Sequence, residues 1–218
     1  MSVDTLLRGR GTFVADLLPE GVLHAAFVRS PFAHARIRAI DAAAARDADG
    51  VIAVLTATDL GPVKPLVSPV TVSGEGRFLA PIKRPILCAE TVRHVGDPVA
   101  LVVATSESAA ADAAELVEVD YDPLAAVGQV TARGEGREAA EIDPAAPGNV
   151  ALRWIAGDWE AVEAAFARAD RVAAVEIDQA RVAPTPLETR GVLAVHDAAT
   201  GRLTLEIPTQ GSAMLAGH

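Results

Sequence analysis

The stretch from residue 98 to residue 123 constrains the fold most, because a strand, a helix and a second strand follow one another directly. The run PVALVVA (98–104) is apolar and β-branched, which is typical of a buried strand. In TSESAAADAAELVEVDYDP, Thr105 or Ser106 can cap a helix, and LVEVDY can return as a strand. The expected apolar stripe of that helix is Ala109, Ala113, Leu116 and Val117. This succession predicts an α/β domain that ends near residue 125.

Three further strands are expected before this unit. LHAAFVRS (23–30) is mostly apolar, HARIRAI (34–40) alternates strictly, and VIAVLTA (51–57) is β-branched. The DAAAARDADG stretch between the last two reads as a short helix closed by Gly50. The alternation places His34, Arg36 and Arg38 on one strand face. This stripe is either a surface for an anionic partner or cofactor phosphate, or a solvated face.

The second half of the chain is predicted to start another unit. Residues 61–85 are rich in proline and read as a long loop, and polar residues 126–149 read as a linker. ALRWIAGD is strand-like, and Asp158 can cap a helix with Trp159, Val162 and Phe166 on its inner face. Strands are expected over 171–181, 191–197 and 202–208, with a turn from Asp197 to Gly201 between the last two.

Composition excludes several classes of partner and site. The formal net charge is −10, and nucleic-acid binders usually carry a basic footprint instead. No apolar run is long enough to span a membrane, and MSVDTLLRGRGTF has no apolar core of a signal peptide. We therefore expect a cytoplasmic protein without a membrane span. Cys88, the single cysteine, cannot by itself hold an iron–sulfur cluster or a structural zinc, and reads as a buried apolar residue.

Few residues suggest chemistry on their own. His24 and His34 can meet across a hairpin, but neither has other ligands at metal spacing. The GRGTF, GEGRF and GEGRE stretches read as turns rather than nucleotide-binding loops. RVAPTPLETRG (181–191) brings Arg181, Glu188 and Arg190 into one segment, either as a buried ion pair or as surface charges on a proline-stiffened crossover.

Gln210 is the most informative single residue. It follows the apolar alternation LTLEIP and precedes Gly211, so a strand is expected to deliver its amide to one place. A primary amide donates two hydrogen bonds without carrying charge, which suits a metal-oxo or phosphate oxygen. The alternative is a strand-end amide that caps the backbone.

Several motifs together resemble a known family. LHAAFVRSPFAHARIRAID, GVIAVLTATDL, VRHVGDPVALVVATSESAAADAAELVEVDYDPL, GNVALRW, RVAPTPLETRG and LTLEIPTQG occur here in one order. They resemble the large subunit of molybdenum hydroxylases: xanthine dehydrogenase, aldehyde oxidase and aerobic carbon monoxide dehydrogenase. The resemblance spans residues 9–211.

The resemblance implies a domain order and a cofactor contact. Residues 1–125 would form an a/b hammerhead domain and 126–149 a linker, and 150–218 would begin the molybdenum-cofactor-binding domain. Gln210, with Gly211, would lie at the cofactor and donate to the oxo group of molybdenum. No catalytic residue and no metal ligand is expected in this chain, because the family's pterin-binding loops and its general-base glutamate have no counterpart here.

The implied function is that of an oxidoreductase component. The family hydroxylates aldehydes, N-heterocycles or related small substrates, or oxidises CO, with water as the oxygen source. It uses molybdenum–molybdopterin, here expected in the cytosine dinucleotide form, and passes electrons through [2Fe–2S] clusters to FAD on partner subunits. We expect a heteromeric complex in which another chain supplies the remainder of the molybdenum subunit. The alternative is an inactive, free-standing hammerhead module or gene remnant with an assembly or binding role.

Overall fold

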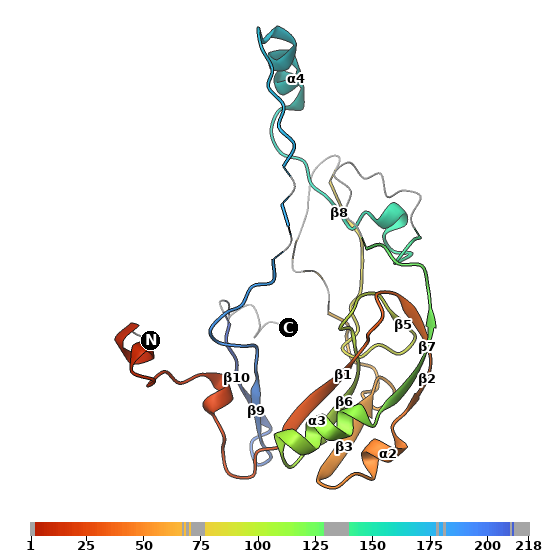
Figure 1. Ribbon diagram of the computed structural model, residues 1–218, viewed down its shortest axis with the longest axis vertical. Coiled ribbons are helices and arrows are strands. Elements are labelled where there is room, and N and C mark those ends of the chain that lie inside the picture. Colours follow the sequence, from red (N-terminus) through yellow and green to blue (C-terminus); the bar gives the residue numbers. More distant parts are fainter. Residues whose placement is uncertain are drawn as a thin grey trace. The chain divides into compact units, whose positions relative to one another are not determined.

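The computed structural model describes residues 3–66, 68, 70, 77–128, 140–177, 179–180, 182–209 and 211. The chain divides into two compact units (Figure 1). The larger unit is Leu23–Ala169, and the smaller unit joins Met1–Val22 to Asp170–His218. No helix within the described ranges is both long enough and apolar enough to cross a membrane.

A three-stranded antiparallel sheet is the centre of the larger unit. Its strands are β1 (His24–Arg29), β6 (Pro98–Ala104) and β3 (Val51–Thr56), with β6 in the middle. Val99, Ala100, Val102 and Ala104 of β6 are buried. The apolar runs predicted over 23–30, 51–57 and 98–104 are therefore confirmed as strands.

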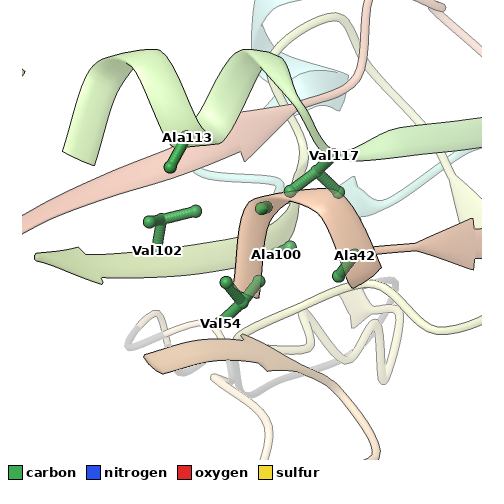
Figure 2. Packing of buried hydrophobic residues seen from close by; sticks show 7 residues of the cluster. Ala42, Val54, Ala100, Val102, Ala113 and Val117 are labelled. Atoms are coloured by element: carbon green, nitrogen blue, oxygen red, sulfur yellow. The ribbon is translucent and has the colours of Figure 1, made fainter. Parts of the chain in front are cut away.

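Two helices cover one face of this sheet. They are α2 (Ala43–Arg46) and α3 (Glu107–Glu115), which pack against each other and against β3. Figure 2 shows Ala113 of α3 above Val102 of β6, with α2 beside them. The buried cluster consists of Ala42, Ala45, Val54, Ala100, Val102, Ala113 and Val117. Because all seven of these side chains are alanine or valine, helices and sheet approach closely.

Helix α3 begins where the sequence predicts. The Ser106 hydroxyl accepts a hydrogen bond from the Ala109 backbone N–H at 3.1 Å, so Ser106 rather than Thr105 is the N-cap. The predicted stripe is partly wrong, because Leu116 is the C-cap residue and is 45% exposed. Ala110 is buried on the inner face instead.

A second sheet lies in the same unit. Strand β2 (Ala35–Asp41) pairs antiparallel with β5 (Thr91–Val92) and with β7 (Glu118–Pro123). Its register with β7 shifts between Ile37 and Ala39. A second cluster of buried apolar side chains contains Ala35, Ile37, Cys88, Val92 and Val99.

The rest of the larger unit is built from short elements. Strand β4 (Phe78–Leu79) pairs antiparallel with β8 (Leu152–Arg153), and the 3-10 helix η3 (Pro147–Asn149) precedes β8. Helix α4 (Trp159–Arg168) is capped by Asp158, which accepts from the Ala161 N–H at 2.9 Å as predicted. The predicted inner face is exposed: Trp159 by 70%, Val162 by 43% and Phe166 by 57%.

The smaller unit contains α1 (Val3–Leu7), the 3-10 helix η1 (Val14–Asp16) and a hairpin of β9 (Leu193–Asp197) and β10 (Arg202–Glu206). The hairpin confirms the strands predicted over 191–197 and 202–208. The strand predicted over 171–181 is wrong for its described residues, 171–177 and 179–180, which form no strand. Exposed Val172, Val175 and Ile177 show that an apolar alternation alone does not provide a pairing partner.

Candidate functional site

The β9–β10 hairpin is the element that leads to the candidate residue. Asp197 begins its turn by accepting hydrogen bonds from the Ala199 N–H at 2.9 Å and the Thr200 hydroxyl at 2.6 Å. The Thr200 hydroxyl, followed by the Ala199 and Thr200 amides, holds the pKa of Asp197 below its usual value. Gly201 has a φ of +70°, which glycine adopts without strain. The turn therefore fixes which residue of β9 pairs with each residue of β10.

The hairpin register separates the side chains of β10 into two faces. Leu203 pairs with His196 and Leu205 pairs with Ala194, so these four side chains share one face. Leu203 and Leu205 are each more than half exposed. Leu203 and Leu205 thus give this two-stranded hairpin an exposed apolar surface.

The strand ends just before the candidate residue. Pro208 has no backbone N–H for a ladder hydrogen bond, so pairing stops at Glu206. The Gly211 N–H donates to the Thr209 hydroxyl at 3.1 Å. Gly211 is half-buried and its amide already has an acceptor. Gln210 itself lies outside the described residues, so its predicted contact stays a prediction.

The segment 181–191 does not form the predicted ion pair in its described residues. Glu188 and Arg190 make no salt bridge with each other there, and Arg181 lies outside the described residues. Glu188 instead accepts from the Val14 N–H at 3.2 Å. The Val14 side chain also lies 3.6 Å from the position a Cβ would take on Gly191. The Glu188 side chain therefore connects η1 by a hydrogen bond to the segment that precedes the hairpin.

The histidines that the structure describes form no reactive cluster with the cysteine. His24 lies on β1 and His34 immediately precedes β2 of the other sheet, so the predicted hairpin contact between them is wrong. His34 is buried, with its Nδ1 2.7 Å from the Ala125 carbonyl oxygen. Burial, with a smaller effect of the Asp97 charge, raises the pKa of Cys88 to about 11. Among the described residues, no three His, Cys, Asp or Glu side chains lie close enough to hold a metal ion.

The basic stripe on β2 is smaller than predicted. His34 is buried, which leaves Arg36 and Arg38 as its exposed members. Arg38 forms an ion pair with Asp122 of β7 at 2.8 Å, and Arg36 lies opposite Asp122 in the strand register. The facing carboxylate offsets the positive charge, which favours the solvated-face alternative over an anion-binding surface.

Comparison with protein families covers both halves of the chain. The model of the a/b hammerhead domain of aldehyde oxidase and xanthine dehydrogenase matches residues 8–125. A molybdopterin cofactor-binding domain matches residues 142–217. The chain belongs to the molybdenum hydroxylase family. Its fold is a hammerhead domain followed by the start of a molybdopterin-binding domain, as predicted from the sequence.

Individual relatives agree with this assignment. The chain is 37% identical to the nicotine 6-hydroxylase large subunit of Paenarthrobacter nicotinovorans, over 94% of this chain and 24% of that protein. It is 38% identical to the carbon monoxide dehydrogenase large chain of Afipia carboxidovorans, over 91% of this chain and 25% of that protein. The chain therefore spans about a quarter of the length of these relatives.

Solved structures show the same relationship. The quinoline 2-oxidoreductase of Pseudomonas putida 86 superposes with a TM-score of 0.77 at 35% identity, over 95% of this chain and 26% of that chain. A Cu,Mo-CO dehydrogenase gives a TM-score of 0.73 at 35% identity, over 93% of this chain and 26% of that chain. These relatives are oxidoreductases, and several are named as subunits of larger enzymes.

Sequence reasoning missed one cluster of polar contacts. Arg93, Asp97, Asp143 and Asn149 are joined by side-chain hydrogen bonds and an ion pair. The stretches RHVGDP and PGN are the sequence indication of this cluster, because each places a glycine beside polar side chains. Both glycines have positive φ in the structure.

Proposed function

We propose that this chain forms the N-terminal part of a molybdenum hydroxylase subunit. The complete enzyme hydroxylates an aldehyde, an N-heterocycle or a related small substrate, or oxidises CO, and takes its oxygen from water. The proposal is carried by the two family matches, which lie in order along the chain, together with the structural likeness over 95% of it. Because the chain spans about a quarter of its relatives, we propose that it acts only with the remainder of the subunit.

The share of this chain in cofactor binding is a single neutral donor. The match to a molybdopterin cofactor-binding domain supports a cofactor that carries its own chemistry and needs hydrogen-bond donors from the protein. Gln210 would hold an oxygen of the molybdenum cofactor, which supplies the redox chemistry when bound. The β9–β10 hairpin and the hydrogen bond from the Gly211 N–H to the Thr209 hydroxyl would position it. In this proposal the chain supplies no catalytic residue.

The remaining parts of the proposal concern assembly. The cofactor would be the cytosine dinucleotide form, and FAD and [2Fe–2S] clusters would reside on partner subunits. The domain limits 1–125, 126–149 and 150–218 belong to the proposal, which is supported by family matches over residues 8–125 and 142–217. Assembly would take place in the cytoplasm.

The first test is purification of the native protein from its source cells, with intact-complex mass and molybdenum content measured on the same sample. A large complex that contains molybdenum, iron and FAD is the expected result. A chain that is isolated alone and without metal would contradict the proposal, and would favour the free-standing hammerhead module.

The role of Gln210 is tested separately by Gln210→Ala in the assembled complex. We expect the molybdenum retained per complex after dialysis to fall, because one donor to the cofactor is lost. Gln179→Ala removes an exposed amide from the same unit and is the matched control. Equal molybdenum retention in the two variants would show that Gln210 does not contact the cofactor.

A further inference from the structure

The segment between the two family matches ends in a well-bonded loop. Residues 140–150 of the larger unit fold around Asn149, whose Oδ1 accepts from the Ile142 N–H at 2.9 Å. The Asn149 Nδ2 donates to the Ala140 carbonyl at 3.1 Å. Asn149 has a φ of +59°, a left-handed conformation that asparagine tolerates better than most residues. Asn149 thus draws the two ends of this loop together.

Arg93 binds this loop from the hammerhead side. Its Nε lies 3.1 Å from Asp143 Oδ2 and donates to the Ile142 carbonyl at 3.2 Å. The Asp143 side chain is only 16% exposed and that of Arg93 is 35% exposed. The pair of Arg38 and Asp122 is more exposed, with side chains 58% and 34% exposed, so solvent screens it more strongly. Asp143 Oδ1 also accepts from the Ala145 N–H, which fixes the carboxylate.

Arg93 is itself held in place by the RHVGD stretch. Asp97 Oδ2 accepts from the backbone N–H groups of Arg93 at 2.6 Å and His94 at 3.2 Å. Gly96, with a φ of +95°, makes the turn that allows this and donates to the Ser30 carbonyl. The Ser30 N–H in turn donates to the Asp97 carbonyl, and Ser30 is 2% exposed. Arg93 therefore belongs to a fixed turn between β5 and β6, which is hydrogen-bonded to Ser30 after the end of β1.

The chain that follows the loop is fixed at a second place. The Ala80 N–H donates to the Ala151 carbonyl at 2.8 Å, and β4 pairs with β8 immediately afterwards. Arg77 Nε donates to the Ile155 carbonyl at 3.0 Å. The start of the molybdopterin-domain match, residues 142–155, is thus bound to residues of the hammerhead match at both ends.

We propose that Arg93, Asp143 and Asn149 form a latch between the two domains. Arg93 is a positioning residue that fixes where the molybdopterin-binding part begins relative to the hammerhead domain. This inference rests on contacts inside the larger unit and does not depend on which reaction the enzyme performs. It also gives a physical role to the RHVGDP and GNV motifs, which the cofactor contact of Gln210 does not explain.

Amide hydrogen exchange of the full chain, read by mass spectrometry, tests the latch. Arg93→Gln keeps most of the aliphatic stem and removes the charge, while Asp143→Asn keeps an oxygen for the Ala145 N–H. We expect exchange at Ile142, Ala145, Ala146 and Asn149 to become about tenfold faster in either variant, because a charge-assisted contact is lost. The double variant is expected to be no faster than either single one. Arg38→Gln removes an exposed pair of the same type and should leave these amides unchanged.

Three results would overturn the latch. Unchanged exchange at these amides in either single variant would show that the ion pair does not hold the loop. Additive acceleration in the double variant would show that the two residues act through different contacts. Faster exchange of the β6 amides by the same factor would show that Arg93 supports the whole core rather than this boundary.

Discussion

At the residue scale, the environment of Cys88 determines how the chain responds to alkali. Burial raises its pKa from 9.0 to about 11, since the thiolate would lose its hydration. The folded state therefore holds this proton more tightly than the unfolded state. The resulting stabilisation is complete below pH 9.0 and is lost as the pH rises through about 11.

This gives a prediction for Cys88→Ala. Unfolding free energies measured over this alkaline range should fall less steeply with pH in the variant than in the natural chain. In the folded natural chain, the thiol should also resist alkylation near neutral pH. Parallel pH profiles, or rapid alkylation without unfolding, would show that the thiol is accessible to solvent.

Gly50 provides a second prediction at this scale. Its φ is +80°, and a Cβ placed on it would lie 2.9 Å from Thr105 Oγ1. Gly50→Ala should therefore cost about 2 kcal/mol or more, from backbone strain and from this clash. Gly61→Ala is the control, because Gly61 has a φ of +65° but open space around its Cβ position, and should cost about 1 kcal/mol. Denaturant unfolding measures the free energy of unfolding of both variants. Equal losses of unfolding free energy would show that the clash with Thr105 does not contribute.

At the element scale, α3 depends on its N-cap. Ser106→Ala removes the acceptor for the Ala109 N–H and should lower the unfolding free energy by about 1 kcal/mol. Ser108→Ala removes a hydroxyl that lies 3.3 Å from the Ser106 hydroxyl but leaves the acceptor for the Ala109 N–H in place. It should be neutral or slightly stabilising, because alanine has the higher helix propensity. A similar loss in both variants would show that the cap hydrogen bond contributes nothing specific.

Elements also show how far the sequence predicts this fold. The runs at 51–57 and 98–104 form strands because their β-branched residues are buried in a sheet. The caps Asp158 and Ser106 were predictable because a helix cap is a hydrogen bond between residues only three positions apart. The inner face predicted for α4 failed because a helical period identifies an apolar face but not what covers it. Arg93 and Asp143 are fifty positions apart, so no periodic pattern links them. The family motifs point to Gln210, which lies outside the described residues, so its contact with the cofactor stays a prediction.

At the scale of the whole molecule, exposed apolar faces connect the structure to the proposed assembly. Both tryptophans of the chain, Trp154 and Trp159, are more than half exposed, and Leu203 and Leu205 share an exposed hairpin face. Monomeric proteins rarely leave large contiguous apolar patches in water, so we expect the remainder of the subunit to cover these side chains. Tryptophan fluorescence should then be strongly quenched by acrylamide in the isolated chain. Quenching should be much weaker in the assembled complex.

Single-tryptophan variants separate the two positions. With Trp154→Phe, the remaining signal reports on α4, and with Trp159→Phe it reports on the residues that follow β8. Protection of Trp159 on assembly would place α4 in the interface with the remainder of the subunit. An isolated chain that is monomeric, melts cooperatively and shows the same quenching in the presence of the remaining subunit segments would favour the free-standing module. In that case the exposed faces would be a property of the folded chain alone, and Gln210 would have no cofactor to contact.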